Sequence, residues 1–142
     1  MKKTLTTIAT VCLLFIGFNS FAMTTHSNPL KGYASTKIVT SYLEAISIGS
    51  VDLSKFLFTE DFEYSNTANN SKHNKSEYCK FLKANKGLVF DCKTSYEILD
   101  ENSQACMAKA IMKFDTFTRV DYITLTNGKE GWKVSKVVTT YP

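Results

Sequence analysis

FTRVDYITLTNGKEGWKVSKVV, residues 117–138, is the stretch that decides the fold we expect of this 142-residue chain. It is typical of two β-strands joined by a turn, because β-branched, aromatic and aliphatic residues predominate on both sides of Asn127-Gly128. An Asn-Gly pair supplies the positive φ angles that a tight hairpin turn requires, so we expect the turn there. The stretch therefore predicts an antiparallel hairpin near the end of the chain.

Side chains alternate along a strand, so each strand of this hairpin has two different faces. Each expected inner row mixes apolar residues with ionisable ones. The rows are Phe117, Arg119, Asp121, Ile123 and Leu125 on the first strand, and Trp132, Val134, Lys136 and Val138 on the return strand. Such a mixture indicates either an apolar pocket with a few polar groups or charges near strand ends that reach solvent by their long stems.

The N-terminus has the layout of a secretory signal peptide. Lys2 and Lys3 precede the apolar run Ile8–Phe18, and Ser20-Phe21-Ala22 fits a cleavage site of small residues. The run is short for a membrane span, so a retained anchor is the weaker alternative and we expect no stable membrane insertion. We expect residues 1–22 to be a signal peptide cut after Ala22, which places the protein in the periplasm or outside the cell. A flexible lead-in (23–33) and one domain (34–142) would follow.

Composition and motifs exclude several functional classes. Removal of Lys2 and Lys3 would lower the formal net charge from +4 to +2, and no basic block with interleaved aromatics is present, so we expect no nucleic-acid binding. His26 and His73 are isolated and have no second ligand at metal-binding spacing, so we expect no metal site. The chain has no phosphate-binding glycine loop, and we expect no cofactor.

The expected mature chain keeps three cysteines, which is an odd number. An exported protein can form disulfides, and Cys79 with Cys92 is the better intrachain candidate because register does not place Cys106 opposite Cys92. The alternative is that all three thiols act as small apolar side chains. The sequence leaves the pairing open.

Helices are expected before strands. Apolar residues at helical spacing predict a first helix from Ser35 or Thr36 to about Ile46, with Gly49 after it. A short second helix near 50–57, a short strand at 62–64 and a polar loop over 65–75 follow. Asn74 and Glu77 form a capping box for a third helix that ends near Lys86-Gly87. Alternation over 96–99 and 106–114 then predicts two strands before the closing hairpin. This order favours an α+β fold, a cone-like roll in which N-terminal helices pack on a curved, mostly antiparallel sheet.

Three segments resemble the nuclear transport factor 2-like superfamily, the SnoaL-like or cystatin-like cone fold. They are IVTSYLEAISIGSVDLSKFLFTEDFEY (38–64), NKSEYCKFLKANKG (74–87) and VDYITLTNGKEGWKVSKVV (120–138). Within the superfamily, the last segment is most similar to the lumazine-binding protein group. The resemblance implies a cone of bent sheet with a pocket between sheet and helices, and a homodimer formed through the outer face of the sheet.

The resemblance leaves three functions open, because fold does not fix function. The first, which we favour, is an exported protein that binds a small apolar or aromatic ligand without catalysis. The second is an isomerase, dehydratase or cyclase, like the ketosteroid isomerases, scytalone dehydratases and polyketide cyclases of the superfamily, with Asp121 as general base and a tyrosine as hydrogen-bond donor. The third is a dimeric interaction module with a filled cone and an apolar outer sheet face.

Asp121 is the residue that separates these functions. Apolar surroundings would disfavour its charged form and suit a base, whereas Arg119, two residues away on the same face, would hold it in a salt bridge. Catalysis requires Asp121 to border a pocket without a full salt bridge. The candidate ligand-binding residues are Tyr42, Tyr96, Arg119, Asp121, Trp132 and Lys136.

Overall fold

The structure, a computed structural model, describes residues 27–142, so the expected signal peptide over 1–22 and its cleavage after Ala22 lie outside the described residues. Apart from one additional short strand at 71–74, helices and strands follow one another in the expected order. They are α1 (Ser35–Ser47), α2 (Ser54–Leu57), β1 (Phe58–Asn66), β2 (Ser71–Asn74), α3 (Lys75–Ala84), β3 (Lys93–Glu101), β4 (Ala105–Lys113), β5 (Thr118–Gly128) and β6 (Gly131–Thr140). No helix in this part of the chain is long and apolar enough to cross a membrane.

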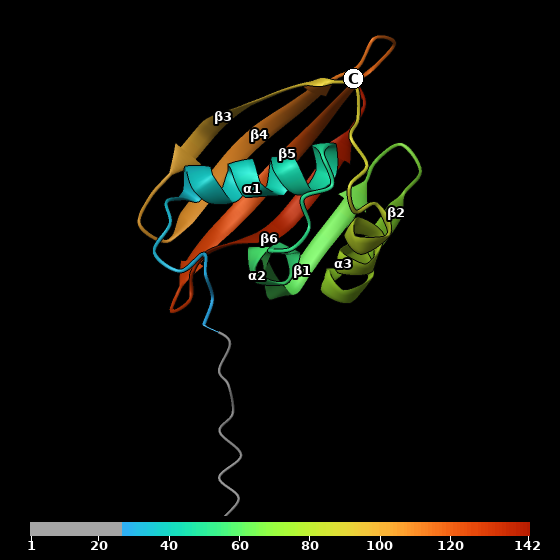
Figure 1. Cartoon of the computed structure of the whole chain (residues 1–142). Helices are drawn as coiled ribbons and strands as arrows, with labels where there is room; N and C mark the ends of the chain where they lie inside the picture. Colours follow the sequence, from blue (N-terminus) through green and yellow to red (C-terminus); the bar gives the residue numbers. More distant parts are fainter. Residues whose placement is uncertain (1–26) are drawn as a thin grey trace, which may run out of the picture.

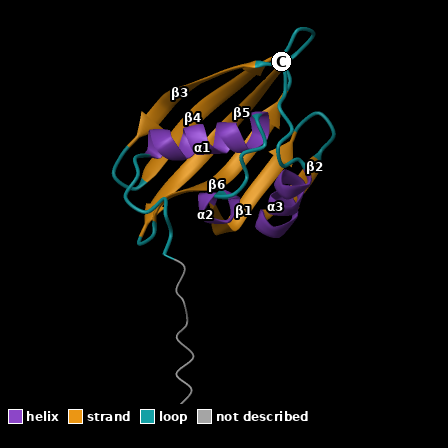
Figure 2. Cartoon of the chain, viewed as in Figure 1, coloured by secondary structure: helices purple, strands orange, loops and turns teal. Residues whose placement is uncertain are grey.

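The strands form one sheet in the order β2-β1-β6-β5-β4-β3. Every neighbouring pair is antiparallel except β1 and β6, which are parallel. The helices lie on one face of this curved sheet, with α1 crossing it and α2 and α3 beside β1 (Figure 1; Figure 2). The expected α+β architecture, helices packed on a curved and mostly antiparallel sheet, is therefore confirmed.

Alternation in β4 explains how α1 packs on the sheet. Cys106, Ala108, Ala110 and Met112 are all buried, while the residues between them are partly or fully exposed. Alanine side chains are small, so the helix can approach the sheet closely at the centre of this row. The helix α1 contacts β4, and its buried apolar side chains include Ile38, Val39, Tyr42 and Ile46.

Aromatic side chains fill the interior of the cone. Phe58 and Phe62 of β1 lie with their ring centroids 4.4 Å apart, and Phe58 meets Tyr78 of α3 edge to face at 5.6 Å. These three rings, together with Tyr42 of α1, are at most 2 % exposed. Space for a ligand therefore lies toward the margins of the sheet.

The turn of the closing hairpin lies two residues beyond the expected position. Gly128 pairs with Gly131, so Lys129 and Glu130 form the turn, and Gly131 has the positive φ of 86°. Asn127 remains in the strand, where its N–H and its side-chain Nδ2 donate to carbonyls in the turn between β3 and β4. The prediction of a turn at Asn127-Gly128 was wrong, because Gly131 supplies the positive φ for a turn at Lys129-Glu130.

A β-bulge in β6 corrects the expected faces of the return strand. Thr124 pairs with Lys136 whereas Leu125 pairs with Val134, so Ser135 is the extra residue. One extra residue moves every later side chain to the opposite face. Lys136 is consequently exposed and shares no face with Trp132 and Val134, contrary to the prediction, and Val138 also leaves the inner face.

Two segments expected to be irregular are structured. In the predicted loop over 65–75, β1 extends to Asn66 and β2 pairs with it, with Tyr64 opposite His73; β2 is an edge strand, which accounts for its polar sequence. The described part of the expected flexible lead-in is packed, because Leu30 is 1 % exposed and Asn28 Nδ2 donates to the Glu130 carbonyl at 3.0 Å.

Candidate functional site

Asp121 lies at the centre of a buried polar network on the inner face of β5. It is 1 % exposed. Its Oδ1 accepts hydrogen bonds from Arg119 Nε at 2.9 Å and Thr139 Oγ1 at 2.7 Å. Its Oδ2 accepts from Arg119 Nη2 at 2.9 Å and Tyr42 Oη at 2.7 Å. Four donors therefore occupy a carboxylate that has about four acceptor positions.

Arg119 and Asp121 form a forked, charge-assisted pair, which is the strong geometry for these two groups. Burial of Arg119 opposes its charge and is the largest single effect, but the charge and hydrogen bonds of Asp121 together with Tyr42 and Tyr78 outweigh it and raise the pKa of the guanidinium above its ordinary value. Arg119 therefore stays a cation. Its Nη1 has no hydrogen-bond partner among the described residues and is not a buried unsatisfied atom, so it remains a free donor.

Two buried tyrosines extend the network from Asp121 toward α3. Tyr42 Oη lies 3.1 Å from Tyr78 Oη. Burial, and then the Asp121 charge, raises the pKa of Tyr42 well above its ordinary value, and burial likewise raises the pKa of Tyr78. Both hydroxyls consequently stay protonated at neutral pH, and Tyr42 can serve as the donor to Asp121.

A pocket of about 230 Å³ adjoins this network between β1, β2, α3 and the C-terminal end. Arg119 and Tyr78 belong to both, so the pocket is continuous with the buried charges. The pocket-lining residues are Tyr64, Asn66, Asn69, Ser71, His73, Tyr78, Phe81, Arg119 and Tyr141.

Rings along one side of this pocket form a stacked series. The Tyr64 and Tyr78 centroids are 4.6 Å apart with an interplanar angle of 22°. His73 stacks on Tyr64 at 5.9 Å, and Phe81 stacks on Tyr78 at 5.9 Å. Tyr64 and Tyr78 are buried, so the ring surface open to a planar ligand is that of His73 and Phe81 at the two ends of the series. We call this site the aromatic pocket.

The chemistry of the aromatic pocket is that of recognition. The Arg119–Asp121 pair has no net charge, and the free Nη1 of Arg119 offers donors to an acceptor atom. Asp121 has all its oxygens engaged, so it lacks a free lone pair with which to abstract a proton from a substrate. This arrangement argues against Asp121 as a general base.

The structure unites three of the six expected site residues and separates the others. Tyr42, Arg119 and Asp121 meet in the buried network. Trp132 is buried in the core at 8 % exposure, and Tyr96 lies in a different hollow beside α1. Lys136 is on the outer face because of the β-bulge at Ser135.

Sequence reasoning missed nine residues of the site: Tyr64, Asn66, Asn69, Ser71, His73, Tyr78, Phe81, Thr139 and Tyr141. Tyr78 and Phe81 lie three residues apart in the predicted third helix and therefore on one face of it, which was a usable signal for the ring series. His73 was missed because β2 was taken for a loop. Thr139 was missed because the bulge at Ser135, which places it beside Asp121, has no clear signature in the sequence.

The remaining chemically interesting groups do not join the network. Cys79, Cys92 and Cys106 are free, and Cys106 is buried. Burial, reinforced by Glu101, raises the pKa of the Cys106 thiol to about 11, so this thiol is protonated and inert at neutral pH. Among residues 27–142, no group of three or more His, Cys, Asp or Glu side chains is placed to hold a metal ion.

Several solved structures have a similar fold. An NTF-2 like protein of unknown function from Silicibacter pomeroyi superposes with a TM-score of 0.62 at 11% identity, covering 75% of this chain and 92% of that one. A DUF3225 family protein of unknown function from Pectobacterium atrosepticum gives 0.63 at 17% identity, covering 75% and 87%. A ketosteroid isomerase-like protein from Erwinia carotovora atroseptica gives 0.60 at 12% identity, covering 75% and 92%.

These comparisons establish the fold as nuclear transport factor 2-like and confirm the resemblance at that level. The chain matches no protein-family model and no curated protein. The similarity to the lumazine-binding protein group is not confirmed. Identities of this size show a shared fold, and a shared fold does not fix function.

Proposed function

We propose that this protein binds a small planar aromatic molecule with a hydrogen-bond acceptor, and that it does so without catalysis. The observation that carries the proposal is that the stacked rings line one pocket together with Arg119, whose Nη1 has no hydrogen-bond partner among the described residues. The volume of about 230 Å³ is below the range of roughly 300–1,000 Å³ usual for ligand pockets. A molecule of one or two rings is therefore the expected ligand.

The Arg119–Asp121 pair defines which ligands would fit. A donor that is already positioned by a second residue recognises an acceptor at low entropic cost. Because the pair is neutral overall, a carbonyl or a ring nitrogen suits it as well as a carboxylate does. A cationic ring would be repelled by the guanidinium group at Nη1, so we expect it not to bind.

An enzymatic function of the isomerase, dehydratase or cyclase kind is the second candidate. One solved neighbour is named a ketosteroid isomerase-like protein, which supports this candidate only through the shared fold. The four donors on Asp121 oppose it, because a general base needs an unoccupied lone pair near the substrate.

Saturation-transfer NMR with a panel of small ring compounds tests the proposal. The panel should contain matched neutral, anionic and cationic members, for example benzamide, benzoate and benzylamine, and fused heterocycles such as lumazine. We expect signals from rings with acceptor groups and none from the cationic member. Tyr141→Ala should abolish these signals, since Tyr141 lines the pocket.

Tyr96→Ala is the matched control for Tyr141→Ala. The two tyrosines are 38 % and 41 % exposed, but Tyr96 lies in the separate hollow beside α1. Binding that survives in both variants, or is lost in both, would place the ligand elsewhere. A panel without any binder would refute the proposed function.

We further infer that the protein is exported and acts in the periplasm or outside the cell. The layout of residues 1–22 supports this, since a charged start, a short apolar run and small residues precede Ala22. Intact-mass measurement of protein expressed from the full chain in a bacterial host should give a chain that begins at Met23. A chain that retains Lys2 and Lys3 would contradict the inference.

We also infer a homodimer formed through the outer face of the sheet. Met107 and Tyr122 are 45 % and 40 % exposed there, next to the partly buried Ile111 and Val138. Sedimentation equilibrium should show a dimer that Met107→Asp converts to a monomer. A wild-type monomer at all concentrations would exclude this assembly.

A further inference from the structure

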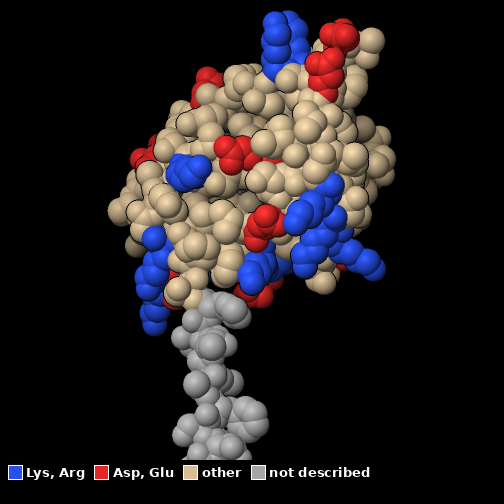
Figure 3. Space-filling view, in the orientation of Figure 1, with Lys and Arg blue, Asp and Glu red and all other residues tan. Residues whose placement is uncertain are grey.

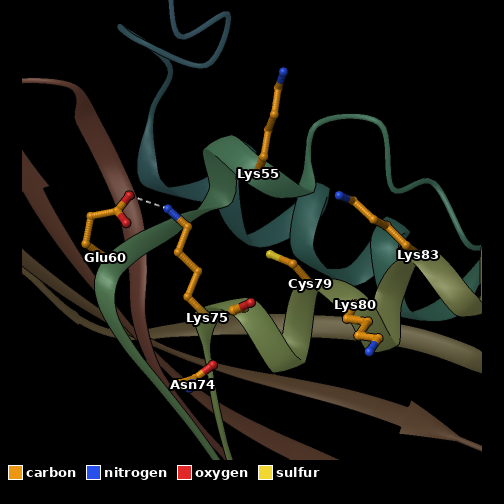
Figure 4. A pocket seen from close by; sticks show the side chains of 8 residues that line it. Lys55, Glu60, Asn74, Lys75, Cys79, Lys80 and Lys83 are labelled. Carbon is orange, nitrogen blue, oxygen red and sulfur yellow. Dashed lines mark hydrogen bonds and ion pairs between the residues drawn. The ribbon is translucent and has the colours of Figure 1, made fainter.

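A second concave site lies between α2 and α3, away from the aromatic pocket. It is a hollow of about 610 Å³ lined by Lys55, Glu60, Asn74, Lys75, Ser76, Cys79, Lys80 and Lys83. Figure 4 shows it from close by, with Lys55 contributed by α2 and most of the other side chains by α3. We call it the lysine hollow. It shares no lining residue with the aromatic pocket.

The charges of the lysine hollow are unbalanced. Lys75 forms an ion pair with Glu60, and its side chain is only 20 % exposed. The other three lysines, Lys55, Lys80 and Lys83, form no ion pair with any residue in the described part of the chain. The lysines of this region gather visibly on one face of the molecule (Figure 3). Like charges held in a concavity repel one another, and a bound anion would relieve that repulsion.

Cys79 provides a reporter inside the hollow. In Figure 4 its thiol lies between the side chains of Lys75 and Lys83, while Lys80 points away from it. Burial raises the pKa of the Cys79 thiol, and Lys75 and Lys83 partly counteract this rise. Both ammonium groups are therefore close enough to act on whatever occupies the space beside the sulfur.

The first turn of α3 forms another border of the hollow. Asn74 and Ser76 line it together with Lys75, and Asn74 Oδ1 accepts from the Glu77 N–H to complete a capping box. The earlier N–H groups of a helix have no partner within the helix, and the helix dipole places partial positive charge there. The border thus adds to the positive potential of the lysines.

We propose that the lysine hollow is an anion site for a tetrahedral oxyanion, either free phosphate or sulfate or the corresponding ester group of a small molecule. The ammonium groups of Lys75 and Lys83 supply the charge beside Cys79, Lys55 adds positive charge at the border of the hollow, and the concave shape favours a compact group over an extended polyanion. The site is independent of the ligand proposed for the aromatic pocket.

Thiol reactivity tests this proposal on protein expressed from the full chain with Cys12→Ser, Cys92→Ser and Cys106→Ala, which leaves Cys79 as the reporter. We would measure its reaction rate with dithionitrobenzoate, a dianionic disulfide, and with dithiodipyridine, its neutral counterpart. The anionic reagent should be favoured, and Lys55→Ala with Lys83→Ala should lower the ratio of the two rates by roughly tenfold. Lys113→Ala with Lys129→Ala, an equal charge change outside the hollow, should leave the ratio within about twofold.

Protection by oxyanions completes the test. Inorganic phosphate, sulfate and glycerol phosphate should each slow the reaction of Cys79 in a saturable way, relative to sodium chloride at equal ionic strength. Tighter protection by glycerol phosphate would assign the site to esters, and equal protection would assign it to the free ion. Protection no greater than that of chloride, or an equal response in the Lys113 and Lys129 control, would overturn the proposal.

Discussion

At the residue scale, the Arg119–Asp121 pair is the most constrained feature of this protein. A buried ion pair is tolerated only when its remaining hydrogen-bonding positions are satisfied. Tyr42 and Thr139 satisfy those of Asp121. Removing one charge of such a pair leaves the other buried and unpaired, and this should destabilise the fold.

Asp121→Asn should destabilise the fold by about 3–5 kcal/mol, since it leaves the Arg119 cation mostly buried without its counter-charge. Urea unfolding followed by circular dichroism measures this change. The double variant Arg119→Met with Asp121→Leu should be clearly more stable than Asp121→Asn, because it removes both charges. A cost for Asp121→Asn below about 1 kcal/mol, the range of exposed pairs, would contradict the buried network.

Alkaline titration probes Tyr42 and Tyr78. Their pKa values are raised above the ordinary 10.0 in the fold by burial, so the unfolded chain loses these protons at lower pH than the folded chain does. Stability should therefore be fully present below pH 10.0 and should fall as the pH rises above it. Phenolate absorbance should show that Tyr42 and Tyr78 ionise only with unfolding, whereas simultaneous titration of all seven tyrosines in the folded protein would contradict their burial.

The face of the sheet on which each β5 side chain lies could be predicted from the sequence. The faces of the β6 side chains could not. Alternation placed Arg119 and Asp121 on the inner face, which the register confirms, since Asp121 lies opposite the buried Ala110. In β6 the bulge at Ser135 reversed the faces of Lys136 and Thr139. A bulge of this type depends on the twist of neighbouring strands, and a single strand sequence does not reveal it.

At the element scale, two glycines join the ends of α1 and α3. Gly49 follows α1 with φ 67°, and Gly87 follows α3 with φ 76°. The Gly87 N–H donates to the Gly49 carbonyl at 3.1 Å. A Cβ on Gly49 would lie 2.3 Å from the Gly87 nitrogen, whereas a Cβ on Gly87 would meet no atom within 4 Å.

Gly49→Ala should therefore cost more stability than Gly87→Ala. Both replacements place alanine at positive φ, at a cost of about 1 kcal/mol, but only Gly49→Ala adds a steric clash with backbone, for roughly 1–3 kcal/mol more. Thermal or urea unfolding of the two variants measures the difference. Equal stability of the pair would show that the α1 and α3 ends are not in contact.

The type and order of the elements could be predicted more reliably than their ends. The capping box at Asn74 and Glu77 gave the start of α3 correctly, because it is a local interaction. The turn at Lys129-Glu130 was missed, since Asn127-Gly128 has equally suitable local chemistry and contacts with the β3–β4 turn hold Asn127 in the strand. β2 was missed because an exposed edge strand needs no apolar alternation.

At the scale of the whole molecule, a filled cone has a consequence for function. Tyr42, Phe58, Phe62 and Tyr78 occupy the interior, so ligand space is displaced toward the side formed by β1, β2 and α3. A fold associated with enclosed pockets therefore has, in this protein, a ring-lined pocket at one side. The sequence could predict the fold, but the place of the pocket depended on β2.

The location of a bound ring compound is the most direct test of this account. Amide chemical shifts should be followed while the strongest binder of the NMR panel is titrated into the isotopically labelled protein. We expect the largest changes at the amides of Tyr64, His73, Phe81, Arg119 and Tyr141, and none at Cys79 or Lys83 in the lysine hollow. Changes confined to the lysine hollow or to the outer face of the sheet would contradict the central claim that the aromatic pocket is the binding site.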